Sequence, residues 1–208
     1  MDALTGVFCA LGVLLLLFAI PLMVDVLPAS VGGLLRSREL IHFENTMCLS
    51  RERDRLALLL LPLFFTALAY YRVFPARLMA ESSMPGVYGW TALFLLAYLL
   101  SRNLCLRVLG PKTDDQRARQ VTARSFFTFY VLLCALMMLT YIALLPFHLP
   151  DASIAPIFRR EIEAMYLIYL IRKGQIIFSY NSIGKTFWYI FTLELLPALA
   201  LASALIFF

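Results

Sequence analysis

Long apolar segments recur along the chain and are separated by short stretches that carry most of the charges. A helix that crosses a hydrocarbon core of about 30 Å needs about 20 apolar residues. Segments of this kind predict six transmembrane helices. They are Leu4–Val26, Leu56–Phe74, Val87–Leu106, Phe126–Leu145, Ile157–Asn181 and Thr186–Phe208. We therefore expect one all-α, polytopic membrane domain over residues 1–208.

The segment Ile157–Asn181 is the least regular of the six, because its uninterrupted apolar run covers only Ala164–Ile171. Charged residues flank that run at positions 159–163 and 172–173. We interpret the segment as a span that contains charges. An amphipathic helix lying on the membrane surface is the alternative.

The basic residues predict an orientation, because short cytoplasmic loops are enriched in Lys and Arg. With an outside N-terminus, 12 of the 18 Lys and Arg residues lie inside, in connections near residues 27–55, 102–125 and 185. Four lie outside, and the remaining two fall within the fifth span. This bias predicts that both termini face outward.

Composition agrees with a membrane protein. Of the residues, 62% are hydrophobic and 15% are charged, whereas soluble domains carry about 25% charged residues. A soluble enzyme is excluded, and topology explains the net charge of +5 better than nucleic-acid binding does. The four cysteines and two histidines lack metal-ligand spacing, so we expect no metal and no cofactor.

The first connection between spans contains a second helical pattern. Residues 37–50 place Leu40, Phe43 and Met47 near one side of a helix and Glu44 largely opposite. The pattern predicts a helix at the membrane interface.

Known catalytic motifs are absent from the sequence, so the candidate chemistry lies in the last hairpin. Asn181–Gly184 has the composition of a tight turn. Arg172 and Lys173 precede this turn by about the same distance as Glu194 follows it. At ~1.5 Å per residue, all three lie roughly 15–18 Å from the turn, near the centre of the bilayer.

Charges at this depth cost ~2.5–3.5 kcal/mol on insertion scales, and they usually pair or mark a functional location. We therefore predict an intramembrane polar site of Arg172, Lys173 and Glu194. One interpretation is a site for an ion, a lipid headgroup or a partner subunit. The others are a structural ion pair and a protonated Glu194 that is hydrogen-bonded to a neighbour.

The same residues carry a resemblance. Arg172-Lys173-Gly174, then Tyr180, then the stretch from Tyr189 to Pro197 that includes Glu194, resemble the C-terminal signature of a family of bacterial multi-spanning inner-membrane proteins of unknown function. The resemblance covers about the last forty residues and implies a bacterial envelope protein. It implies no activity, and it assigns Gly174, Tyr180 and Pro197 to the signature or to helix packing.

These observations favour a non-catalytic subunit or assembly factor of a bacterial inner-membrane complex, with protein export or envelope biogenesis as the expected setting. Its expected partners are membrane lipid and other inner-membrane proteins. The first alternative is a small transporter or channel that uses Arg172, Lys173 and Glu194. The second is a membrane-embedded enzyme that modifies lipid.

Overall fold

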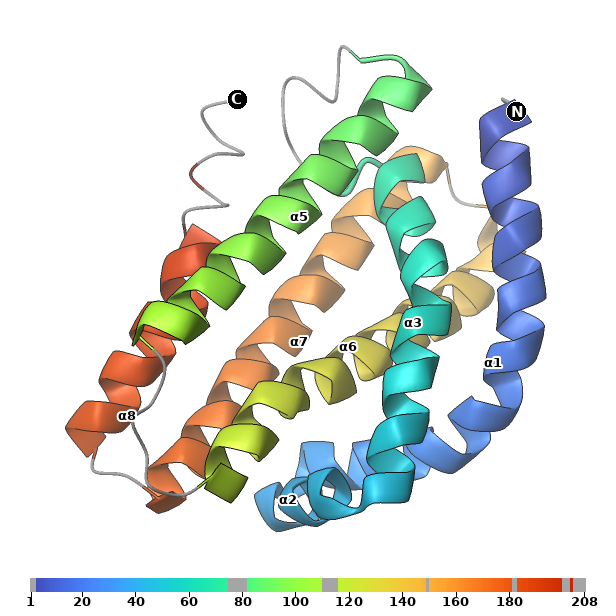
Figure 1. The fold of residues 1–208 in the computed structure, drawn as a ribbon. Helices are drawn as coiled ribbons and strands as arrows, with labels where there is room; N and C mark the ends of the chain where they lie inside the picture. Colours follow the sequence, from blue (N-terminus) through green and yellow to red (C-terminus); the bar gives the residue numbers. More distant parts are fainter. Residues whose placement is uncertain are drawn as a thin grey trace.

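The computed structural model describes residues 3–74, 82–109, 116–148, 150–180, 183–199 and 203, and within these ranges all regular structure is helical. The helices are α1 (Ala3–Leu35), α2 (Ser37–Asn45), α3 (Met47–Tyr70), α5 (Met84–Leu109), α6 (Gln116–Leu144), the 3-10 turn η1 (Leu145–Phe147), α7 (Asp151–Tyr180), α8 (Ile183–Ile190) and the π-helical turn η2 (Phe191–Leu195). The long helices run in alternating directions through one bundle (Figure 1).

Three described helices are long and apolar enough to cross a membrane. They contain the segments Ala10–Leu35, Met84–Leu104 and Arg124–Phe147, which fall on the first, third and fourth predicted spans. Among the other elements, α3 carries charges in its first turns and α7 carries charges in both halves. The fold is therefore all-helical and compatible with a membrane protein.

The helices extend beyond the predicted apolar spans. α1 continues to Leu35, α6 begins at Gln116 and α7 begins at Asp151. For the span predicted over 186–208, the helix begins at Ile183, and residues 200–202 and 204–208 lie outside the described part. Hydropathy locates the part of a helix that avoids water, whereas the backbone hydrogen bonds continue into the polar turns beyond it.

The helix predicted over residues 37–50 is interrupted at Thr46. Thr46 has an extended backbone (φ −83°, ψ 103°) that separates α2 from α3. Leu40 and Phe43 are buried, but Met47 begins α3 and is 82% exposed. Glu44, predicted to lie largely opposite the apolar side, is also buried. The break rotates the residues after Thr46 away from the face that α2 buries.

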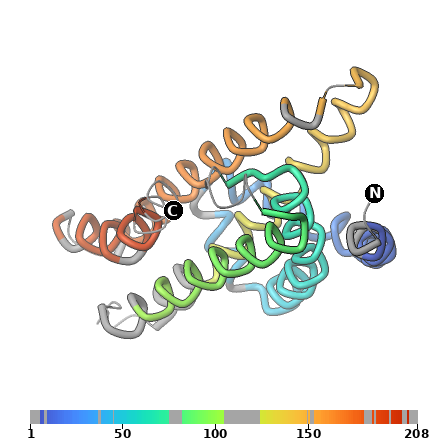
Figure 2. Tube along the Cα trace, turned by 90° about the horizontal axis from the view of Figure 1, so that it is seen from above, coloured from blue at the N-terminus to red at the C-terminus, as the bar shows by residue number. Residues whose placement is uncertain are grey.

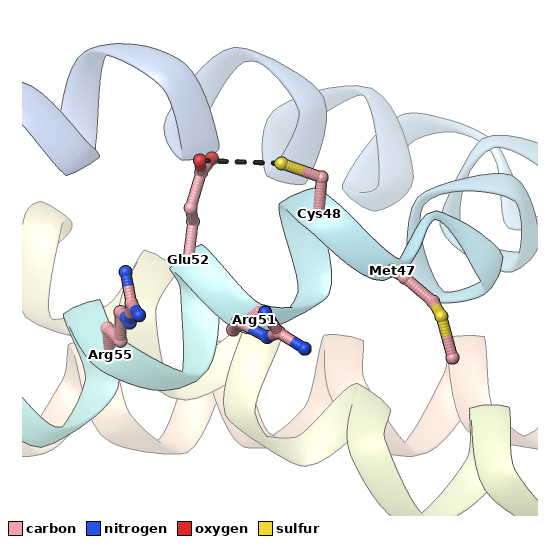
Figure 3. A pocket seen from close by; sticks show the side chains of 5 residues that line it. All are labelled: Met47, Cys48, Arg51, Glu52 and Arg55. Atoms are coloured by element: carbon pink, nitrogen blue, oxygen red, sulfur yellow. Dashed lines mark hydrogen bonds between the residues drawn. The ribbon is translucent and has the colours of Figure 1, made fainter.

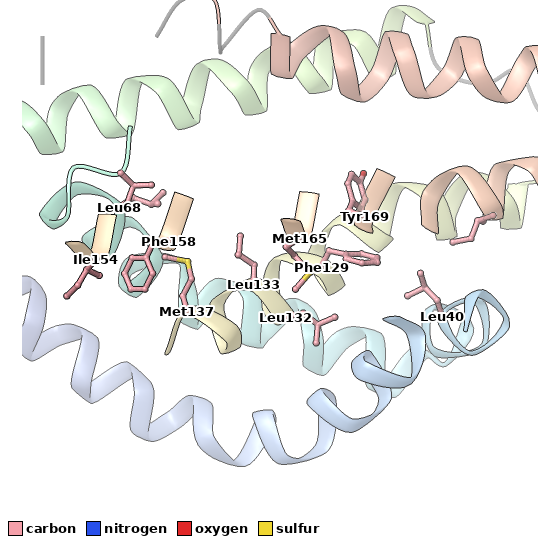
Figure 4. Packing of buried hydrophobic residues seen from close by; sticks show 12 residues of the cluster. Leu40, Leu68, Phe129, Leu132, Leu133, Met137, Ile154, Phe158, Met165 and Tyr169 are labelled. Atoms are coloured by element: carbon pink, nitrogen blue, oxygen red, sulfur yellow. The ribbon is translucent and has the colours of Figure 1, made fainter. Parts of the chain in front are cut away.

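Helix α6 lies at the centre of the bundle, where it contacts α1, α2, α3 and α7. Of its apolar segment, 44% is buried, against 17% for that of α1. Seen from above, α1 and α8 lie at opposite edges (Figure 2). One apolar cluster joins α2, α3, α6 and α7 (Figure 4). It includes Leu40, Leu68, Phe129, Leu132, Leu133, Met137, Ile154, Phe158, Met165 and Tyr169.

Candidate functional site

The π-helical turn η2 positions Glu194 in the bundle. Helical backbone angles continue through Ile190 before the turn and Leu196 after it, so η2 is a local widening of one helix. π-Helical turns are rare in proteins, and those that do occur are often found at functional sites. The Glu194 side chain is fully buried, and the Tyr166 hydroxyl donates a hydrogen bond of 2.8 Å to its backbone carbonyl oxygen.

Side chains from α5 and α7 meet the Glu194 carboxylate, and we call Arg102, Tyr169, Lys173 and Glu194 the Glu194 cluster. Lys173 forms an ion pair with Oε1 of Glu194. The Tyr169 hydroxyl donates to the same oxygen at 2.7 Å, and Nε of Arg102 lies 3.4 Å from it. Lys173 Nζ also donates to the Tyr169 hydroxyl at 3.0 Å. One carboxylate oxygen thus connects three elements of the bundle.

Water is largely excluded from this cluster. The side chains of Lys173 and Arg102 are 1% and 7% exposed. The Arg102 guanidinium lies 4.3 Å from the centroid of the Phe126 ring, a cation–π contact that partly replaces hydration. The second oxygen of Glu194, Oε2, is buried without a hydrogen-bond partner among the described residues.

The structure brings together two of the three residues of the predicted polar site. Lys173 and Glu194 form the ion pair, whereas Arg172 points elsewhere. Its guanidinium donates to the Gln175 side chain at 2.7 Å and to the Leu35 carbonyl at 2.9 Å. Consecutive helical residues differ by about 100° in direction, so only one of the two cations faces Glu194.

Arg102 and Tyr169 were not predicted to belong to this site. Arg102 falls inside the span Val87–Leu106, but it was counted with the basic loop that follows. Its position within an apolar run is the sequence feature that could have indicated a buried charge. Tyr169 lies one helical turn before Lys173, which places the two side chains on one face of α7. Tyrosine is common in apolar segments, so only the fold distinguishes this one.

The residues assigned to the signature occupy different positions. A Cβ added at Gly174 would lie 2.9 Å from Cδ1 of Ile190, so the absent side chain allows α7 and α8 to approach closely. Pro197 is buried in the helix after η2. Tyr180 ends α7, but its side chain lies outside the described part. Their membership of a family signature stays a prediction.

A second buried ion pair lies near the α2–α3 junction, and we call Glu44, Arg53 and Thr128 the Glu44 cluster. Arg53 pairs with Oε1 of Glu44, and both side chains are fully buried. The Thr128 hydroxyl donates to the same oxygen at 2.6 Å. Burial raises the pKa of Glu44, while the Arg53 charge and the Thr128 hydrogen bond oppose that shift. This cluster fastens α2 to α3 and α6.

Within the described ranges, no three His, Cys, Asp or Glu side chains gather in a way that would hold a metal ion. The buried charges described above form two ion-paired clusters. No protein family, curated protein or solved structure matches this chain.

Proposed function

We propose that this chain is a non-catalytic subunit or assembly factor of a bacterial inner-membrane complex, and that its buried charges hold its own helices together. The observation that carries the proposal is the closure of the Glu194 cluster. Its charged groups pair with one another across α5, α7 and η2 and are almost inaccessible to water. A substrate or coupling ion would have to displace those contacts before it bound.

The proposal includes six membrane crossings with both termini outside. The alternating directions of the long helices support it (Figure 1). One end of the bundle holds α2. At this same end lie the C-terminal ends of α5 and α7 and the N-terminal ends of α6 and α8 (Figure 1). The sequence places most of its basic residues near these ends. Packing of α7 along α6 supports a crossing helix over one that lies on the surface.

The outer face of α5 is the surface we propose for a protein partner. Gly89 and Ala92 are both exposed there, and nothing lies within 4 Å of a Cβ added at Gly89. Small residues let transmembrane helices approach closely, and close packing drives their association. Exposed bulky residues, such as Val13 and Phe18 on α1 and Leu96 on α5, suit contact with lipid.

The test is purification from native membranes in a gentle detergent, followed by mass spectrometry of the bound proteins. The proposal predicts stoichiometric membrane-protein partners. Gly89→Leu should remove them because a large side chain blocks the close approach. Gly6→Leu is the matched control, since a Cβ at Gly6 also meets nothing within 4 Å. A chain that always emerges alone would contradict the proposal.

The second candidate is a small transporter or channel, and two features of Glu194 favour it. Its π-helical turn is of a kind often found at functional sites, and Oε2 is buried without a partner in the described part of the chain. Reconstitution into vesicles tests this candidate directly. Ion or lipid movement that is lost in Glu194→Gln, from a chain that purifies alone, would replace the subunit proposal.

A further inference from the structure

The first turns of α3 carry a cavity that neither cluster uses. Its volume is about 360 Å³, and it is lined by Met47, Cys48, Arg51, Glu52 and Arg55 (Figure 3). Cys48 donates a hydrogen bond to Glu52 through its sulfur at 3.6 Å. By contrast, the exposed Arg51 and Arg55 form no hydrogen bond or ion pair with the residues that the structure describes. The cavity therefore has two uncommitted cations and a net positive charge.

These two arginines lie on one exposed stripe of α3. They are four residues apart and therefore neighbours on the helix surface. Leu58 continues the stripe and is 71% exposed. The exposed face changes from cationic to apolar within a single turn, between Arg55 and Leu58. On a helix that enters a bilayer, such a change marks the boundary between headgroups and hydrocarbon.

We propose that Arg51 and Arg55 bind the phosphate of an anionic phospholipid whose acyl chains lie along Leu58. Guanidinium groups bind phosphate oxygens through charge-assisted, often bidentate, hydrogen bonds. The Glu52 carboxylate points with Cys48 toward one side of α3, whereas Arg51 points away from them (Figure 3). Among the described residues, no ion pair joins Glu52 to Arg51 or Arg55. The site rests on the membrane crossing of α3 that the proposed function includes, but not on the subunit role.

Native mass spectrometry of the purified full chain in micelles, titrated with phosphatidylglycerol or phosphatidylcholine, tests the site. The test variant is Arg51→Gln with Arg55→Gln. The matched control is Arg36→Gln with Arg160→Gln, which removes two charges from exposed ion pairs elsewhere. A cation near an anionic lipid surface contributes about fivefold to affinity. We therefore expect the test variant, which lacks two cations, to bind phosphatidylglycerol about thirtyfold more weakly, and the control to bind it normally.

Two comparisons decide between occupants. The wild type should prefer phosphatidylglycerol to phosphatidylcholine, and Arg51→Lys with Arg55→Lys should retain part of that preference because it keeps both charges. Equal binding of both lipids by the wild type and the test variant would overturn the proposal. Displacement of phosphatidylglycerol by millimolar inorganic phosphate would also overturn it, since the occupant would then be free phosphate. The unfolding midpoint of each variant should match that of the wild type, because both arginines are exposed.

Discussion

The Glu194→Gln substitution tests whether the Glu194 cluster stabilises the fold. It keeps the side-chain volume but removes the only carboxylate that pairs with Lys173 and Arg102 among the described residues. Those cations are 1% and 7% exposed, so neither gains compensating hydration. Breaking a buried ion pair in this way costs about 3–5 kcal/mol. We expect the free energy of unfolding to fall by that amount.

A double-mutant cycle with Lys173→Met separates loss of the pair from loss of a residue. The double variant removes both charges of the Lys173–Glu194 pair, so it leaves one buried cation, Arg102, without a carboxylate instead of two. It should therefore unfold with a smaller loss than Glu194→Gln alone, with a coupling energy of about 0.5–3 kcal/mol. Lys173→Met alone leaves Arg102 as the partner of Glu194.

Titration of the micellar protein with SDS, followed by circular dichroism and by the fluorescence of the two tryptophans, measures these losses. Glu163→Gln is the control, because Glu163 pairs with Arg160 at 2.9 Å while both side chains are more than half exposed. An exposed pair contributes at most about 1 kcal/mol. The prediction is contradicted if Glu194→Gln lowers the free energy of unfolding no more than this control does, or if the losses of the two single variants simply add in the double variant.

Three further predictions concern the packing, the Glu44 cluster and the topology. Gly174→Leu should destabilise the protein more than Gly174→Ala in the same titration, because even a Cβ would lie 2.9 Å from Ile190. Burial raises the pKa of Glu44. Because the folded state then holds this proton more tightly than the unfolded state, the free energy of unfolding of the wild type should fall as the pH rises above about 4.3. Glu44→Gln should lack this pH dependence. In intact cells, an impermeant thiol reagent should not label a variant whose only cysteine is Cys48. The same reagent should label Ser83→Cys in an otherwise cysteine-free chain. The reverse pattern would invert the topology.

Sequence reasoning identified the main apolar helices and one buried ion pair for simple physical reasons. A long run of apolar residues has one favourable environment, so α1, α5 and α6 could be located without knowledge of their neighbours. Lys173 and Glu194 lie at similar distances from one turn, which places them at similar depth. Their contact follows if the two helices are antiparallel.

The missed residues depend on helix rotation and on exact helix ends. Depth alone does not distinguish Arg172 from Lys173, since adjacent residues share a depth but face different directions. Arg102 reaches Glu194 from α5, which is distant in sequence. The sequence predicts one continuous helix with Glu44 opposite its apolar side, whereas the extended backbone at Thr46 begins a new direction. Such features depend on how the helices pack, which hydropathy does not encode.

Site-specific photocrosslinking in native membranes tests the proposed subunit role most directly. A photoreactive residue replaces Ala92, which is exposed on the outer face of α5. The control position is Val13 on α1, which is 62% exposed. We expect that Ala92 yields an adduct with a different membrane protein, that Gly89→Leu abolishes this adduct, and that Val13 yields none. If position 92 crosslinks to no other protein, the proposed subunit role is contradicted.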